Sequence, residues 1–189
     1  MRSLRKLLLT LHVGFSVGWL GAVAAFLVLA LIALCGSDLD QARSIYVALA
    51  PLTWFVIVPL SLASLVSGVT QSLITPWGLW QHYWVIAKLL LNVGATLLLF
   101  VHTQPIDLLA RAAAAGNLTE LAGLRRQLVL DAGAAAVALA TATVLSVYKP
   151  VGQTSAAPPR WVYASSLVVL LCLSLVVAAH LSGRGLGHH

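Results

Sequence analysis

Five long stretches of predominantly apolar residues alternate with short polar segments along this chain of 189 residues. About 20 such residues in a helix cross the hydrocarbon core of a bilayer, because each residue adds about 1.5 Å and the core is about 30 Å thick. Within lipid the backbone must satisfy its own hydrogen bonds, which requires a helix in each stretch. The predicted spans cover residues 7–34, 52–74, 84–102, 127–147 and 161–181. The sequence therefore predicts an all-α, polytopic membrane helix bundle that forms a single transmembrane domain over residues 1–189.

The scarcity of charge supports this class and excludes others. Only 8% of the residues are charged, whereas an ordinary soluble domain has about 25%. The net charge of +6 arises from 11 Lys and Arg against 5 Asp and Glu, which is too small an excess to form a phosphate-binding surface. Soluble globular, disordered and nucleic-acid-binding classes are excluded, and the lipid bilayer is the expected partner.

The polar segments carry local structural signals. In the loop 103–126, residues 105–115 are closed by Gly116 and predict a short helix separate from the spans. Asp38 or Asp40 is expected to cap an N-terminal extension of the second span. A proline at position 59 is expected to kink the same span, because it removes a backbone donor.

Positive charges indicate the orientation. With a cytoplasmic N-terminus, the inner side holds Arg2, Arg5, Lys6, Lys149 and Arg160. The outer side then holds Arg43, Arg111, Arg125, Arg126 and Arg184. The cluster before the first span decides between the two orientations, because the first helix usually dominates. We therefore expect a multi-pass protein of the inner (plasma) membrane, with the N-terminus cytoplasmic and the C-terminus outside.

Small residues in the first span suggest a packing face. Gly14 and Gly18 form a GxxxG pair, a pattern that lets helix backbones approach closely. A homo-oligomer or a membrane partner could bind through this face. The alternative is that the pattern reflects only the abundance of glycine and alanine in the chain.

Ionisable residues within spans are costly and point to function. His12 lies in the first span, Lys88 in the third and His180 at the end of the fifth, while His82 and His102 flank the third. Histidines near opposite leaflets on facing helices hold haem in b-type cytochromes. His102 and His180 would form one such pair near the outer leaflet, and His12 would lie near the inner leaflet with His82 or Lys88. The histidines at 12, 102 and 180 are thus the candidate metal ligands.

The third span also carries a polar stripe. Lys88 and His102 are 14 residues apart, which places them within about 40° on one helix face and roughly 21 Å apart along the axis. Asn92 and Thr96 lie between them on the same face. We expect this stripe to face the bundle interior rather than lipid.

Each of these residues also has a simpler interpretation. His102 and His180 end their spans and would then lie in interfacial water, while Lys88 would extend its ammonium to the headgroups. His12 lies deeper, about one and a half turns into the first span, and is the strongest candidate.

Asp131, in the fourth span, has two interpretations as well. It is close in sequence to Arg125 and Arg126, and an ion pair with one of them at the outer interface is favoured over a proton relay.

Motifs for other chemistries are absent from the sequence. It contains no CxxC, HExxH, phosphate-binding glycine loop or nucleophile elbow. The single Met argues against a methionine-lined copper path. Cys35 ends the first span, whereas Cys172 lies near the middle of the fifth, so the two are expected to be free thiols rather than a disulfide.

Two segments resemble a group of small bacterial membrane proteins. The residues Leu-His-Val at 11–13 and Gly-Trp-Leu-Gly at 18–21 resemble the first-helix signature of the copper-resistance D proteins and the HemJ-type protoporphyrinogen oxidases. The segment 75–89, with its Thr-Pro-Trp-Gly and His-Tyr-Trp steps, resembles an uncharacterised family in the same group. The resemblance implies that His12 and Lys88 associate with haem or porphyrin. It covers the first three spans and does not carry the full oxidase pattern, so no enzymatic activity follows.

Three functions therefore compete. The first is binding of b-type haem (haem b) or a porphyrin, with a redox or electron-transfer role. The second is a cofactor-free structural or accessory subunit whose polar groups form interhelical hydrogen bonds. The third is transport of a small solute or metal along the stripe from Lys88 to His102.

Overall fold

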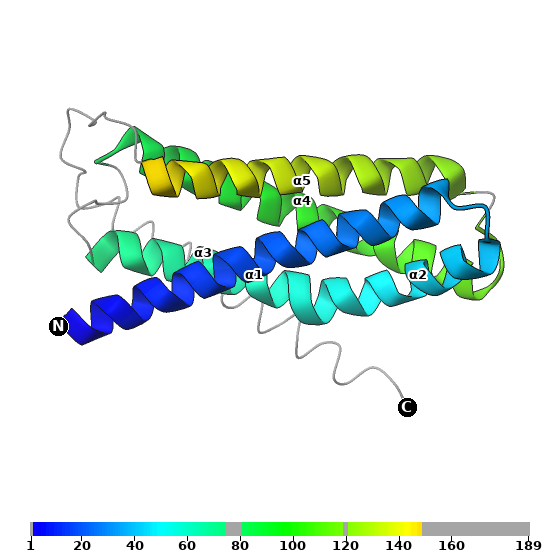
Figure 1. Ribbon diagram of the computed structural model, residues 1–189, viewed down its shortest axis with the longest axis horizontal. Helices are drawn as coiled ribbons and strands as arrows, with labels where there is room; N and C mark the ends of the chain where they lie inside the picture. Colours follow the sequence, from blue (N-terminus) through cyan, green and yellow to red (C-terminus); the bar gives the residue numbers. More distant parts are fainter. Residues whose placement is uncertain (1, 75–80, 119–120, 149–189) are drawn as a thin grey trace.

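The computed structural model describes residues 2–74, 81–118 and 121–148 (Figure 1). These residues are almost entirely helical, which confirms the all-α prediction. The elements are α1 (Arg2–Cys35), α2 (Leu39–Leu52), a π-helical segment η1 (Thr53–Ile57), α3 (Val58–Ile74), α4 (Tyr83–Ala114) and α5 (Ala122–Tyr148).

Four helices within the described residues are long and apolar enough to cross a membrane. They are Ser3–Cys35, Leu39–Ile74, Tyr83–Ala114 and Ala122–Tyr148. The protein is thus a multi-pass membrane helix bundle, and its first four predicted spans each fall on one of these helices. The fifth predicted span, 161–181, lies outside the described residues, as does His180.

The helices run along one long axis and form a bundle with two distinct ends (Figure 1). The first end carries the beginnings of α1 and α4 and the final turns of α3 and α5; we call it the His12 end. At the opposite end α1 finishes and α2 begins; we call it the Asp38 end. α1 packs against α2, α3 and α5, and α4 packs against the same three helices.

The interior of the bundle combines a few large side chains with small ones. Trp19, Tyr46 and Leu109 are fully buried, and so are the alanines at positions 30 and 33 of α1. These alanines let neighbouring helices approach α1, where dispersion forces act over a large area. Large apolar side chains also point outward; Phe55, for example, is 79% exposed in the isolated chain. Such an apolar exterior is suited to lipid rather than water.

The second span is longer than its apolar stretch. Asp38 caps it, because its Oδ1 accepts hydrogen bonds from the backbone N–H groups of Asp40 (2.9 Å) and Gln41 (3.1 Å). This confirms the predicted extension. The π-helical segment η1 lies just upstream of Pro59 and includes Phe55, the residue whose carbonyl loses its usual donor at Pro59. The kink expected at this proline stays a prediction.

The prediction of a separate short helix at 105–115 needs correction. The segment is helical and closes at Gly116, whose φ of 83° suits glycine. It is nevertheless the last part of α4, which passes through Pro105 without a break. A proline removes one backbone hydrogen bond, but Ile106 and Leu109 are buried in the core on the same helix. Their packing continues the helix beyond the proline.

Candidate functional site

A cavity of about 670 Å³ opens at the His12 end between α1, α3, α4 and α5. Its lining surface is mainly apolar, and all four helices contribute polar groups to it. The polar lining residues include Arg5, Lys6, His12, Ser64, Lys88 and Asn92. Among the described residues, no acidic side chain lines it.

His12 is anchored in this cavity by α3. Its Nδ1 lies 3.1 Å from the Ser67 hydroxyl oxygen. That hydroxyl has one hydrogen, which it donates to the backbone carbonyl of Ala63 at 2.6 Å. A carbonyl only accepts, so the serine oxygen must accept from Nδ1–H of the imidazole. In the neutral ring, a hydrogen on Nδ1 leaves the lone pair on Nε2, and this is the form in which histidine binds metals.

Gly68 makes room for the imidazole. A Cβ at this position would lie only 2.8 Å from Cε1 of His12. The absence of a side chain therefore sets how closely the ring lies against α3. Ser67 and Gly68 were not predicted as site residues. The sequence does contain a pattern that could have indicated Ser67, because Ser61, Ser64 and Ser67 recur at helical spacing in the second predicted span.

Lys88 lines the same cavity from α4. Its ammonium lies 5.8 Å from the centroid of the Trp84 ring, within the range of a cation–π contact. The rest of the predicted stripe follows the inner side of the helix. The Asn92 amide donates to the Lys88 carbonyl (2.9 Å), and the buried Thr96 hydroxyl donates to the Asn92 carbonyl (2.8 Å).

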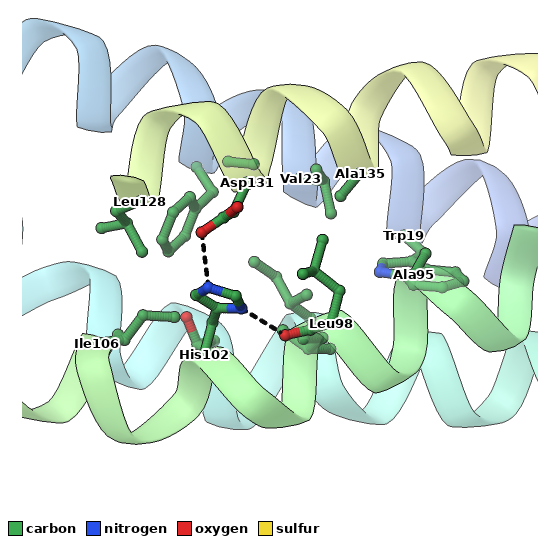
Figure 2. A pocket seen from close by; sticks show the side chains of 14 residues that line it. Trp19, Val23, Ala95, Leu98, His102, Ile106, Leu128, Asp131 and Ala135 are labelled. Carbon is green, nitrogen blue, oxygen red and sulfur yellow. Dashed lines mark hydrogen bonds and ion pairs between the residues drawn. The ribbon is translucent and has the colours of Figure 1, made fainter. Parts of the chain in front are cut away.

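His102 lies elsewhere, in contact with α5. Its Nε2 is 2.6 Å from Oδ2 of Asp131, and its Nδ1 is 2.8 Å from the Leu98 carbonyl (Figure 2). Both ring nitrogens are therefore engaged. His102 and His12 line separate cavities, so the structure brings Lys88, but not His102, together with His12.

The expected pair between Asp131 and a neighbouring arginine is wrong. Arg125 instead donates to the Ala33 carbonyl (2.6 Å) and to the Tyr46 hydroxyl (3.2 Å), while Arg126 is exposed. The physical reason is that α1 ends beside α5 and presents unpaired carbonyls, which attract the guanidinium.

The remaining candidate residues contribute less to a site. His82 directly precedes α4, and its ring centroid lies 6.1 Å from that of Trp84. Among the described residues, no three His, Cys, Asp or Glu side chains lie together as a metal-binding group. A metal held by this part of the chain would need most of its ligands from a cofactor, as iron does in haem.

Gly14 and Gly18 do not share one environment. A Cβ at Gly18 would meet Leu60 of α3 at 3.5 Å, whereas one at Gly14 would meet nothing within 4 Å. Gly18 therefore packs inside the bundle. An oligomer or partner through this face stays a prediction.

The fold and the polar cavity together define the class of this protein, a multi-pass membrane helix bundle. No protein-family model matches the chain, and no curated protein or solved structure is similar to it.

Proposed function

We propose that this protein binds a b-type haem, or a related porphyrin, in the cavity around His12 and uses it in a redox or electron-transfer role. One observation carries the proposal: His12 and Lys88 line the same cavity, and Nδ1 of His12 lies 3.1 Å from the Ser67 hydroxyl oxygen. Haem iron in electron-transfer and oxygen-binding proteins is commonly held by an imidazole nitrogen.

The contact with Ser67 supports His12 as the residue that would bind the haem iron. Histidines that bind metals almost always donate their other ring N–H to an oxygen, which fixes the tautomer and the ring orientation. The bond from Nδ1 to the Ser67 oxygen has this arrangement. When bound, the haem would supply the one-electron chemistry, and the protein would supply the ligand and the surrounding apolar wall.

The charges of the cavity support a ligand with carboxylate groups. Arg5, Lys6 and Lys88 line it, and no acidic side chain among the described residues is part of its lining. A porphyrin has a flat apolar ring and carboxylate side chains, which cations bind by charge-assisted hydrogen bonds. Leu65 and Val69 are among the apolar residues that would contact the ring. The resemblance of His12 and Lys88 to the early histidine and the helix-3 lysine of HemJ-type proteins further supports this ligand class.

The proposed site does not include the other histidine pair. His102 would have to leave Asp131 before its Nε2 could bind iron. Its predicted partner, His180, lies outside the described residues.

An absorption spectrum tests the proposal. Detergent-purified protein, expressed with haem supply or incubated with haemin, should show a Soret band that His12→Ala removes. His82→Ala is the matched control, because this histidine is close to the same end but does not line the cavity, and it should retain the band. A colourless wild-type protein that takes up no haem, or a band unchanged in His12→Ala, would contradict the proposal.

A cofactor-free accessory subunit is the second candidate. The contacts of His12 with Ser67 and of Ser16 with Ser64 (2.8 Å) satisfy polar groups between α1 and α3 without any ligand. For such a subunit, His12→Ala would weaken helix association and would not change an absorption spectrum.

We further propose that the protein resides in the inner (plasma) membrane with its N-terminus in the cytoplasm. Arg5 and Lys6 lie at the start of α1 at the His12 end, and Arg43, Arg111, Arg125 and Arg126 lie toward the Asp38 end, so the cluster before the first span supports this orientation because the first helix usually dominates. Cytoplasmic ends of membrane helices are enriched in Lys and Arg. Five spans would then place the C-terminus outside.

A further inference from the structure

Arg5 and His12 line the same cavity from one face of α1. They are seven residues apart in the chain, which places them within about 20° of each other around the helix axis. The same spacing corresponds to about 10.5 Å along the axis. Arg5 is the one nearer to Arg2, where α1 begins. The guanidinium is therefore closer to the mouth of the cavity, and the imidazole is deeper.

Lys88 has a comparable position on α4. It lies five residues after Tyr83, the first residue of α4, which is about 7.5 Å along the axis. The beginnings of α1 and α4 lie at the same end of the bundle (Figure 1). Lys6 adds a third cation there, and the other described residues of the lining carry no fixed charge. The cavity thus has positive charge near its mouth and an uncharged interior.

Arg5 is held in place by the end of α3. Its Nη2 donates a hydrogen bond to the backbone carbonyl of Ile74 at 2.8 Å. Ile74 is the last residue of α3, and the final carbonyls of a helix have no partner within it. A guanidinium has five N–H donors in a planar fork, of which this bond uses one. The carbonyl therefore orients the group and leaves donors for a ligand.

From this arrangement we propose that Arg5 binds a carboxylate of the ligand, so that the cavity selects porphyrins whose carboxylate groups are free. The inference rests on the proposed function and deepens it, because it names the class of porphyrin that the cavity accepts. The ring lies in the deeper part, beside His12, and its carboxylate edge lies at Arg5. A porphyrin with esterified carboxylates has the same ring but no charge for Arg5 to bind.

Desolvation favours this orientation over the reverse one. A carboxylate in the deeper part of the cavity would lose its hydration without meeting a cation, which is strongly unfavourable. At the mouth it remains close to solvent, since Arg5 is exposed, and it gains charge-assisted hydrogen bonds. The planar fork of Arg5 matches both oxygens of a carboxylate, whereas the ammonium of Lys6 acts as a point charge. Arg5 is therefore the residue that distinguishes an acid from an ester.

Titrations with haemin and with its dimethyl ester test the proposal. The full chain is placed in nanodiscs of phosphatidylcholine, a lipid without net charge, and the Soret band reports the dissociation constant of each ligand. Arg5→Gln should weaken haemin binding about tenfold or more, because a charge-assisted hydrogen bond is lost. Binding of the ester should be unchanged, so the preference for the acid over the ester should fall by the same factor.

Two further variants separate ligand binding from folding. Arg5→Lys keeps a donor for the Ile74 carbonyl but lacks the fork, so it should fold as the wild type and still lose part of the preference for haemin. Arg126→Gln is the matched control, because it removes an exposed arginine that does not line the cavity, and it should leave both dissociation constants unchanged.

The outcomes distinguish this inference from the proposed function. If both Arg5 variants retain the wild-type preference for haemin over the ester, Arg5 only holds the end of α3 and the inference is wrong. The Soret band of the wild type would in that case still support haem binding at His12. A wild type that binds neither ligand would overturn the inference and the proposed function together.

Discussion

At the scale of single residues, the site depends on one imidazole and the space left for it. His12 is held by a hydroxyl whose own hydrogen is committed to the backbone of α3, and its ring lies against Gly68. The two atoms in contact, Nδ1 of His12 and the hydroxyl oxygen of Ser67, belong to residues 55 positions apart in the chain. Histidine at 12 was recognisable as unusual within an apolar span, but its tautomer follows only from the contact with Ser67.

Substitution of Gly68 by alanine should separate binding from folding. The new Cβ would meet the tip of the His12 side chain at 2.8 Å rather than backbone, so the ring should rotate away at a cost of about 0.5–1.5 kcal/mol. We expect Gly68→Ala to lose most of the Soret absorbance per mole of protein while the unfolding transition shifts little. Haemin titration followed by absorbance, with denaturation in the same detergent, measures both.

Gly94→Ala is the matched control for that experiment. A Cβ at Gly94 would meet nothing within 4 Å, so haem uptake should equal that of the wild type. Equal loss of absorbance in both variants would refute a specific role for the space at Gly68.

At the scale of elements, a few polar contacts connect helices that otherwise pack through apolar surfaces. Ser16 and Ser64 connect α1 to α3, while Arg125 connects α5 to the end of α1 and to α2. The helices themselves were largely predictable, since hydropathy and the Asp38 cap are local. The continuity of α4 through Pro105 was not, because it depends on side chains buried against other helices.

Arg125 should contribute to stability more than its neighbour. Its guanidinium donates to the Ala33 carbonyl and lies 5.4 Å from the centroid of the Tyr46 ring. We expect Arg125→Ala to lower the free energy of unfolding by about 1.5–3 kcal/mol, because a charge-assisted bond is lost. Arg126→Ala removes an exposed arginine and should change the free energy of unfolding by less than about 0.5 kcal/mol. Reversible unfolding in mixed micelles compares the two, and equal losses would argue against the connecting role.

The hydrogen bond between Ser16 and Ser64 should produce a measurable coupling energy. Their hydroxyl oxygens lie 2.8 Å apart across α1 and α3. Interhelical bonds in a membrane protein contribute about 0.6 kcal/mol on average and at most about 1.7 kcal/mol. A double-mutant cycle of Ser16→Ala and Ser64→Ala should yield a value in this range. Strict additivity of the two substitutions would show that the bond contributes nothing.

At the scale of the whole molecule, charge is distributed unevenly between the two ends. The cavity with Arg5, Lys6 and Lys88 lies at the His12 end, and the described acidic residues lie toward the Asp38 end. The sequence alone had placed five Lys or Arg residues on each side of the membrane, so a count of cations did not distinguish the two ends. The folded bundle shows that the acids and the cavity cations are separated along its axis.

Cysteine labelling tests the proposed orientation. Cys35 is exposed at the end of α1, so in a Cys172→Ala background a membrane-impermeant maleimide should modify it on intact spheroplasts. In the matched variant, with Ser3→Cys added and Cys35→Ala, modification should require permeabilised membranes. The reverse pattern would place the N-terminus outside.

The sequence by itself determined the class of this protein, because a bilayer leaves long apolar stretches only one way to satisfy their backbone hydrogen bonds. It also identified His12, Lys88, His102 and Asp131 as exceptions to the apolar pattern. Only the tertiary structure decided their partners. Pairing depends on which helix faces meet, and this is set by side-chain packing between segments distant in the chain. For that reason His12 meets Ser67 and shares a cavity with Lys88, whereas Asp131 meets His102 instead of the arginines beside it in sequence.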